Sequence, residues 1–503
     1  MAFSSRTDDE TREYFDSPEE LDSKVTKLAE AIKNSKHFIA FTGAGGIQCM
    51  WHWFVCVDWL NIGKDTVLET GAGVWTRQAA DGKGETYKKG KSTSMFKAMP
   101  SKTHMALVAL FEAGYLKHLT SQNVDGLHRI SGFNIDGLDE LHGNCKLEVC
   151  SECRRQYLRD FEVYGSIHSH ETGRLCSVQS CKGALKDTII HFGETLPEKD
   201  INSAFANANT ADVCLAIGSS LTVTPAADVP KRVGKKTSNT LCIVNLQKTP
   251  LDQYAKIRIY AKCDSVMELL MQKLEVPIPV WYLERCVQIE VASDAKINKK
   301  TISVTALDRD DITPASIFDI ITIHYGTKKE TKSFALRKLC SHFDKTKIKI
   351  KNWKLLCLDN VTIELSFMKH YNEPNLVLRL TDLVPKNENS TNDKSKENTT
   401  NTNTNTDNTK ENVNDKSKEI PKENAEEKKE EKKEEKTDQA EKVKIEGSWE
   451  VLLGLKYNPL KGEWEPPLTK KFTLHKTEKV VDSKATKKSF ESLFSFLGKK
   501  QKE

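Results

Sequence analysis

The chain has 503 residues, too many for one ordinary hydrophobic core, so we expect two or three domains. Its formal net charge of +5 permits contact with nucleic acid or chromatin but does not argue for it. Residues 1–20 are acidic and polar, and the apolar run from Met50 to Leu60 is about half as long as a membrane span, so we expect no secretory signal and no transmembrane segment. The thirteen cysteines are then expected in a reducing compartment, without disulfides.

The first predicted element is a helix from Ser17 to Asn34. A capping start, Asp-Ser-Pro, precedes apolar residues that recur at helical spacing. A predicted strand at 37–41 then leads into Thr42-Gly43-Ala44-Gly45. A strand followed by a glycine-rich turn is how a doubly wound α/β domain presents backbone N–H groups to a phosphate, although a plain tight turn has the same composition.

Two short cysteine pairs lie further on, as Cys150-x2-Cys153 and Cys176-x4-Cys181. Each pair supplies two thiolates from one tight turn, which is typical of a tetrahedral zinc site. Four unrelated core cysteines are the alternative, but the stretch 154–175 is charged and polar and offers little core to bury thiols. Because four thiolates leave no open coordination position, we expect a structural zinc that does no chemistry.

Two more strand-to-turn units follow, each ending in small or amide residues: 212–217 before Gly218-Ser219-Ser220, and 241–244 before Asn245. Together with the first strand, they are typical of the ligand-facing carboxyl edge of a parallel sheet. The sequence therefore predicts an α/β domain with a Rossmann-like, doubly wound parallel sheet and a small zinc-binding module.

Beyond about Pro279 the hydrophobic period changes to two, which predicts short antiparallel strands. The alternating positions are Val287, Ile289 and Val291; Ile302, Val304 and Ala306; Val361, Ile363, Leu365 and Phe367; Leu376, Leu378 and Leu380; and Trp449, Val451, Leu453, Leu455 and Tyr457. Residues 386–441, rich in Asn and Thr and then in Lys and Glu, are too polar to order themselves. We expect an antiparallel β-sandwich-like module interrupted by this disordered tract, and a short amphipathic stretch at 489–497 that docks on the module or binds a partner.

Three segments, in this order and spacing, resemble the sirtuin family of NAD-dependent lysine deacylases. They are Ser121-Gln122-Asn123-Val124-Asp125-Gly126-Leu127-His128, Leu141-His142-Gly143-Asn144 with its cysteine clamp, and Gly218-Ser219-Ser220-Leu221 leading to Ile243-Val244-Asn245-Leu246-Gln247. The resemblance covers about residues 15–285. Within the family, the short zinc insert and the segments 71–76 and 172–176 are most similar to the nuclear, chromatin-directed branch.

The resemblance implies a reaction in which an acylated lysine is deacylated, with release of nicotinamide and O-acyl-ADP-ribose. His142 would be the general base, a task suited to imidazole because its ordinary pKa lies near neutrality. Asn123 would orient ribose or water, Asp125 would hold the nicotinamide carboxamide, and Gln122 would contact the ribose, although Asn-Val-Asp-Gly is also a good turn sequence.

The other cofactor contacts implied by the resemblance are Gly43, Ala44 and Gly45 at the pyrophosphate, Trp75 beside nicotinamide, Gly218, Ser219 and Ser220 at the adenosine half, Asn245 and Gln247 at the adenine ribose, and the backbone of Cys263 at adenine. Cys263 equally suits an ordinary core thiol. The substrate peptide is expected to add as a strand between residues 191–194 and 221–225.

The chain departs from the family between Gly45 and Gly63. Sirtuins carry a loop there that continues Gly-Ala-Gly-Ile-Ser and passes through Gly-Ile-Pro-Asp-Phe-Arg, whose Phe and Arg grip the cofactor. Here residues 46–62 hold three of the eight tryptophans and neither a Phe nor an Arg counterpart. The stretch looks like translated intron or shifted-frame sequence, and an apolar lid is the alternative. Losing a guanidinium contact of this kind costs a few kcal/mol of cofactor affinity.

Three functions follow as hypotheses. The first is an NAD-dependent deacylase that acts on histone tails or other nuclear proteins, with zinc as its structural metal. The second is a catalytically impaired scaffold, which the missing Phe and Arg favour, and the third is protein mono-ADP-ribosyl transfer. We expect location in the nucleus, otherwise in the cytoplasm, with possible chromatin association and no membrane partner. The expected domains are 15–285, with the zinc module at about 145–186, then 286–385, the tract 386–441, and 442–503.

Overall fold

The computed structural model of the chain describes residues 12–43, 97–166, 168–191, 193–294, 299–327, 330–337, 346–351, 361–384 and 448–475. Outside these residues lie Ala44, Gly45, Trp75, the departing stretch 46–62, the predicted tract 386–441 and the amphipathic stretch 489–497. No helix in the described ranges is both long enough and apolar enough to cross a membrane.

The first domain is built on a six-stranded parallel sheet, in the order β10-β9-β8-β1-β2-β3. The strands are β1 (Phe38–Thr42), β2 (Leu116–Ser121), β3 (Leu138–Glu140), β8 (Val213–Ile217), β9 (Thr240–Val244) and β10 (Ile257–Ile259). Three of them, β1, β8 and β9, are the strands that the sequence predicts. The order reverses beside β1, where the chain leaves β1 for β2 on one side and later returns to β8 on the other, as in a doubly wound fold.

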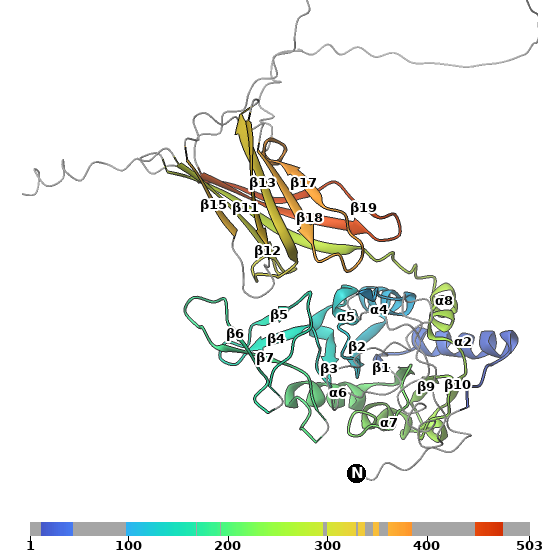
Figure 1. Ribbon diagram of the computed structural model, residues 1–503. Helices are drawn as coiled ribbons and strands as arrows, with labels where there is room; N and C mark the ends of the chain where they lie inside the picture. The colour runs from blue at the N-terminus through green and yellow to red at the C-terminus, as the bar shows by residue number, and fades with distance from the viewer. Residues whose placement is uncertain are drawn as a thin grey trace, which may run out of the picture. The chain divides into compact units, whose positions relative to one another are not determined.

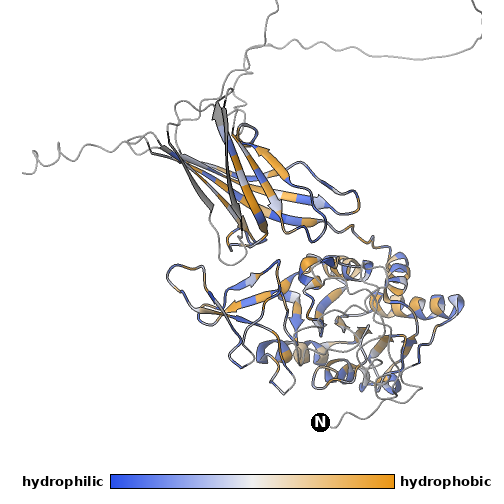
Figure 2. Cartoon of the chain, viewed as in Figure 1, coloured by the Kyte–Doolittle hydropathy of each residue, from blue (hydrophilic) through white to orange (hydrophobic). Residues whose placement is uncertain are grey.

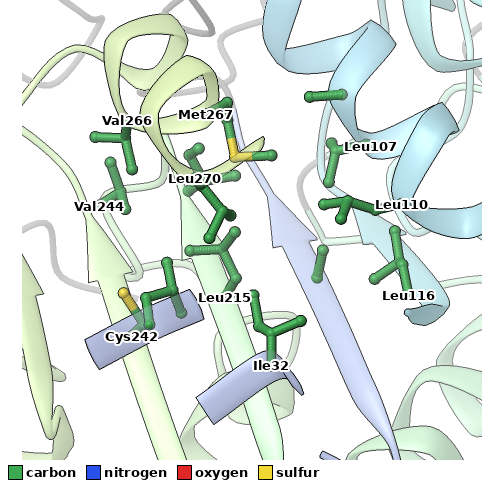
Figure 3. Close-up of a cluster of buried hydrophobic side chains, with 14 of the residues drawn as sticks. Ile32, Leu107, Leu110, Leu116, Leu215, Cys242, Val244, Val266, Met267 and Leu270 are labelled. Atoms are coloured by element: carbon green, nitrogen blue, oxygen red, sulfur yellow. The ribbon is translucent and has the colours of Figure 1, made fainter. Parts of the chain in front are cut away.

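Helices cover both faces of this sheet (Figure 1). They are α2 (Pro18–Lys33), α4 (Lys102–Glu112), α5 (Leu127–Ile130), α6 (Glu198–Thr210), α7 (Asp228–Gly234) and α8 (Cys263–Leu274), with single 3₁₀ turns η2 (Ile135–Gly137), η3 (Asp252–Tyr254) and η6 (Leu380–Leu383) elsewhere in the chain. Helices α2, α4 and α8 pack on one face, where their leucine, isoleucine, valine and methionine side chains meet those of β2, β8 and β9 (Figure 3). Helices α6 and α7 pack on the other face. The strands are therefore buried on both sides, as parallel strands usually are.

The predicted first helix is confirmed, including its start. Ser17 caps α2 by accepting the Glu20 N–H at 3.2 Å, and the Glu20 carboxylate accepts the Ser17 N–H at 3.0 Å. This reciprocal pair satisfies two N–H groups that a helix start leaves free.

A small antiparallel sheet forms a separate layer of the first domain, in the order β5-β4-β7-β6. Its strands are β4 (Leu147–Cys150), β5 (Gln156–Leu158), β6 (Glu171–Leu175) and β7 (Ala184–Asp187). These four strands lie in the sequence around the four cysteines of the predicted zinc site.

The remaining strands form the predicted antiparallel β module. One sheet has the order β15-β12-β11-β18-β19, with β20 also paired to β18, and the other has the order β14-β13-β16-β17. The strands are β11 (Leu283–Asp294), β12 (Lys299–Leu307), β13 (Phe318–Thr327), β14 (Glu330–Arg337), β15 (Thr346–Lys351), β16 (Thr362–Phe367), β17 (Leu376–Arg379), β18 (Ser448–Asn458), β19 (Glu463–Trp464) and β20 (Leu468–His475). Most of the predicted alternating positions are buried. The alternation of apolar and polar residues along these strands is visible as orange and blue bands (Figure 2).

Strand β18 joins this module although it follows the predicted tract in the sequence. It pairs with β11 from Leu283 opposite Tyr457 to Val291 opposite Trp449. The segments on either side of residues 385–447 therefore share one sheet, as the alternation predicts.

Candidate active site

The predicted cofactor residues that the structure describes gather at one edge of the parallel sheet. They are Gly43 after β1; Gln122, Asn123 and Asp125 after β2; His142 after β3; Gly218, Ser219 and Ser220 after β8; Asn245 and Gln247 after β9; and Cys263 at the start of α8 after β10. The carboxyl ends of neighbouring parallel strands meet at the same edge, where doubly wound folds bind ligands.

The ends of β1, β2 and β8 are tightly packed around Gly43. The Ser219 hydroxyl donates to Oε1 of Gln122 at 2.8 Å, and a Cβ on Gly43 would lie 2.7 Å from Cβ of Ser219. Glycine is therefore required here by close packing. Gly218 has a φ of +68°, in the left-handed region that favours glycine. The pyrophosphate and ribose contacts of these residues stay predictions.

On the side predicted to hold adenosine, polar side chains form hydrogen bonds with residues two positions further along the chain. The Asn245 amide donates to the carbonyl oxygen of Gln247 at 2.9 Å, and the hydroxyls of Ser220 and Thr222 are 2.8 Å apart. The Cys263 side chain is buried in the core beneath α8, as expected of an ordinary core thiol. Only its backbone is left for the predicted adenine contact.

Asn123 and Asp125 are buried side chains with unmet hydrogen bonds. Asn123 is 3% exposed and Asp125 is 1% exposed. Within the described part of the chain, neither side-chain amide atom of Asn123 has a partner, and Oδ2 of Asp125 has none, whereas its Oδ1 accepts the Leu127 N–H at 2.8 Å. A buried polar atom without a partner costs about 1–3 kcal/mol. A ligand that carries amide and hydroxyl groups, as NAD does, fits this position.

The pKa of the Asp125 carboxyl is also shifted in a way that suits ligand binding. Burial raises its pKa to about 6, although the Leu127 N–H and the charge of Lys146 oppose the shift. The carboxyl is therefore ionised at neutral pH at a cost in free energy, and an N–H donor from a ligand would reduce that cost.

His142 is presented by a turn that only glycine can complete. Gly143 has a φ of +80°, and a Cβ there would lie 1.7 Å from the carbonyl oxygen of Thr188. The Nδ1 of His142 lies 3.2 Å from the carbonyl oxygen of Gln122, which can only accept, so Nδ1 carries the proton and Nε2 keeps its lone pair. Burial lowers the pKa of His142, although the bond to Gln122 opposes the shift. A neutral imidazole with a basic Nε2 is suited to general-base catalysis.

Two buried histidines near this edge were given no role by the sequence. The Thr42 hydroxyl lies 2.9 Å from Nε2 of His128, and the rings of His128 and His104 have centroids 4.8 Å apart. Burial lowers the pKa of His128 to about 3, and burial together with the charge of His128 lowers the pKa of His104 well below its ordinary value. Both rings are therefore neutral. His104 lies on α4, where nothing in the apolar spacing distinguishes it from a surface histidine.

The four predicted zinc ligands meet in one cluster. The Sγ atoms of Cys150, Cys153, Cys176 and Cys181 all lie within 4.8 Å of one another, with two pairs at 3.6 Å. Tetrahedral zinc with Zn–S bonds of about 2.3 Å separates its sulfurs by about 3.8 Å. The thiols fit zinc, and the alternative of four unrelated core cysteines is wrong.

A buried ion cluster supports the zinc-binding sheet. The Glu148 carboxylate on β4 is fully buried and accepts Nε–H of Arg159 at 2.6 Å and Nε–H of Arg174 at 2.5 Å. Arg159 is 2% exposed, whereas the Arg174 side chain is 21% exposed. The cluster ties β4 to β6 and to the residue that follows β5.

Comparisons with known proteins agree with this arrangement. A family model described as Sir2 family matches residues 59–225, so the match begins inside the departing stretch 46–62. The NAD-dependent protein deacetylase SRT1 of Arabidopsis thaliana is 41% identical over 268 residues, which are 53% of this chain and 52% of that protein. The human NAD-dependent protein deacetylase sirtuin-7 is 37% identical over 281 residues, 54% of this chain and 64% of that protein.

A third relative is matched over more of its length. The NAD-dependent protein deacetylase Sirt6 of Drosophila melanogaster is 33% identical over 278 residues, 53% of this chain and 80% of that protein. The chain spans only about half to two thirds of the length of the plant and human relatives. Among solved structures, Sir2 bound to acetylated peptide is 23% identical with a TM-score of 0.36, and the match covers 50% of this chain and 99% of that chain.

Proposed function

Since this chain belongs to the Sir2 family, we propose that it is an NAD-dependent protein-lysine deacylase. The proposed reaction moves the acyl group of a modified lysine to ADP-ribose and releases nicotinamide. The relatives' names support it, and one observation on this chain carries it. His142, with its basic Nε2, follows β3, and Asn123 and Asp125 follow the neighbouring strand β2 at the same edge of the parallel sheet. Both of the latter carry buried polar atoms that have no partner among the described residues.

The residues at this edge would hold NAD. Asp125 would accept the carboxamide N–H of nicotinamide, and Asn123 would bond to a ribose hydroxyl or to water, which would satisfy the polar atoms that have no partner. Gln122 would contact the ribose, and the residues after β8 and β9 would contact the adenosine half. Bound NAD would supply the ribose carbon that receives the acyl oxygen as nicotinamide leaves.

His142 would take a proton at Nε2 from a ribose hydroxyl. Its lowered pKa keeps the ring neutral and able to accept a proton at physiological pH. As the ring gains charge, the carbonyl oxygen of Gln122 would stabilise the proton already held on Nδ1. The backbone thus fixes the tautomer that the reaction needs.

Zinc would stabilise the fold of this domain without taking part in the reaction, because its four thiolates leave no open coordination position. In the same proposal, the catalytic domain spans residues 15–285 with the zinc module at about 145–186. Residues 286–385 and 442–503 would make up the β module and its basic tail, on either side of the linker 386–441.

The finer proposal is a histone or other nuclear protein as substrate, and location in the nucleus. The similarity of residues 71–76 and 172–176 to the chromatin-directed branch supports it, as does the likeness to proteins named sirtuin-7 and Sirt6. Mono-ADP-ribosyl transfer would use the same NAD site, since it also starts with release of nicotinamide.

A catalytically impaired scaffold is the second candidate. It is favoured by residues 46–62, which lack the Phe and Arg of the family's cofactor loop and lie outside the described residues. A scaffold would bind its partners through the β module and the charged tract, and it would not turn over NAD.

The test is nicotinamide release by the purified full chain, loaded with zinc, from NAD and an acetyl-lysine histone-tail peptide. His142→Ala should abolish release and deacetylation, whereas His168→Ala, at an exposed histidine, should retain both. Absence of turnover in the folded wild-type protein would overturn the proposal and favour the scaffold. Deacetylation that survives in His142→Ala would overturn the role of His142.

A further inference from the structure

His170 lies between two carboxylates that come from different parts of the chain. Its Nδ1 is 2.9 Å from Oδ1 of Asp187 at the end of β7, and its Nε2 is 3.2 Å from Oε1 of Glu194. The φ of His170 is +59°, a backbone conformation in which a side chain with a Cβ is strained. Neither the zinc ligands nor the proposed catalytic residues include it. A ring bonded at both nitrogens can act as a clasp between the two carboxylates.

The clasp holds both ends of the segment 187–191. At one end, the Asp187 carboxylate also accepts the N–H of Gly165 at 2.6 Å and that of Ile189 at 3.1 Å. At the other end, Glu194 uses its second oxygen, Oε2, to accept the N–H of His191 at 2.6 Å. The His170 ring therefore links the Asp187 carboxylate, at one end of the segment, to the Glu194 carboxylate, which holds the other end.

The middle of the same segment lies against the loop that carries His142. The Ile190 N–H donates to the carbonyl oxygen of His142 at 3.1 Å. Thr188 bonds twice to Asn144, accepting its N–H at 3.0 Å and donating to its carbonyl oxygen at 3.1 Å. The 1.7 Å approach that a Cβ on Gly143 would make to Thr188 shows that the two backbones are in direct contact. A shift of the segment would therefore move the His142 loop.

We propose that His170 is a positioning residue for the deacylation proposed above, on which this inference rests: by clasping Asp187 and Glu194 it fixes residues 187–191 against His142. The segment ends at His191, where the substrate peptide is expected to pair. Loss of the clasp should therefore impair peptide binding more than NAD binding.

The charges around the ring make the clasp depend on pH. Burial lowers the pKa of His170, but the bond to Asp187 and the charges of Asp187 and Glu194 outweigh burial and raise it. Another titratable group facing the ring, among the residues that the structure describes, is His191, whose ring stacks on it with centroids 5.7 Å apart. Because the folded-state pKa is raised, the clasp is strongest at low pH, where His170 is charged, and weakens as pH rises through that pKa.

The test uses His170→Asn, because asparagine tolerates the left-handed backbone but cannot reach both carboxylates. The matched control is His168→Asn, an exposed histidine two residues earlier. On the zinc-loaded full chain, the KM for an acetyl-lysine histone-tail peptide, kcat and the Kd for NAD are measured between pH 6.5 and 8.5. Exchange of the Ile190 amide hydrogen is followed in the same samples.

At pH 6.5 the peptide KM of His170→Asn should rise roughly five- to tenfold, less than the full effect of losing a charge-assisted hydrogen bond, because the clasp contacts the segment and not the peptide itself. Its kcat should fall as well, because the His142 loop moves with the segment, whereas its NAD Kd should change less than about twofold. The KM difference should shrink toward pH 8.5, and the Ile190 amide should exchange faster. A peptide KM equal to that of the control at every pH would overturn the inference. If the wild type does not turn over, the proposed function fails, and the inference is then tested by hydrogen exchange at the Ile190 amide. Faster exchange in His170→Asn than in the control supports the clasp, and equal exchange overturns it.

Discussion

Replacing Asp125 by asparagine should stabilise the free protein. Burial is the main reason that the pKa of this carboxyl rises from 3.8 to about 6. Each pKa unit corresponds to about 1.4 kcal/mol, so keeping the carboxyl ionised at neutral pH costs the fold roughly 3 kcal/mol. Asparagine has nearly the same size, keeps an oxygen for the Leu127 N–H, and carries no charge to bury. The gain in the free energy of unfolding should approach roughly 3 kcal/mol at pH 7.5.

The sign of the pH dependence distinguishes this mechanism from a general stabilisation. Because the folded-state pKa of Asp125 is raised, its favourable contribution is present below the unfolded-state value and is lost as pH rises through about 6. The advantage of Asp125→Asn should therefore be small near pH 4.5 and grow up to pH 7.5. Urea unfolding of both proteins at several pH values measures it, with the exposed Asp136→Asn as control. No gain at pH 7.5, or a gain that is equal at all pH values, would refute the reasoning.

Asp125→Asn should also weaken the binding of NAD. A hydrogen bond to a charged acceptor contributes about 1.5–3 kcal/mol, which corresponds to roughly 10- to 150-fold in the Kd for NAD. Calorimetric titration of NAD into the wild type and Asp125→Asn compares the two values. A variant that is more stable and binds NAD less well would show that this carboxylate is kept buried and charged for its ligand.

Three further predictions concern the framework. Cys176→Ser should lose bound zinc and lower the melting temperature, as should chelation, whereas Cys214→Ser, at a buried thiol on β8, should keep its zinc by elemental analysis. Glu148→Gln should lower the free energy of unfolding by about 3–5 kcal/mol in urea, because it leaves a buried guanidinium uncompensated, while the exposed Glu152→Gln should change it little. Cleavage within 385–447 should leave two fragments that elute together, because β11 and β18 stay paired, and separation of the fragments would contradict the sheet order.

Features set by near neighbours in the chain could be predicted from the sequence. The α2 cap joins residues three apart, Ser17 and Glu20, and each cysteine pair lies within one turn of the chain. The alternation that places Val287, Ile289 and Val291 on a buried face is a property of the extended backbone itself. The small and amide residues at strand ends indicated the ligand-facing edge, because parallel strands bring their carboxyl ends together.

The chemical state of the site came only from tertiary structure. Nothing in the sequence around Asp125 indicates that its carboxyl is buried with one oxygen that has no partner among the described residues, since burial depends on segments packed over it from elsewhere. The bond between Thr42 and His128 joins residues 86 apart, and the contact of His170 with Glu194 joins residues 24 apart.

The sequence by itself therefore determined the fold class, the cysteine cluster that fits zinc and the sheet edge at which the proposed site lies, because these follow from local backbone geometry and ligand spacing. The tautomer of His142, the raised pKa of Asp125 and the contacts of His170 with two carboxylates were decided only when distant segments packed together. The physical reason is that desolvation and charge pairing depend on distance in space, which the order of residues does not give.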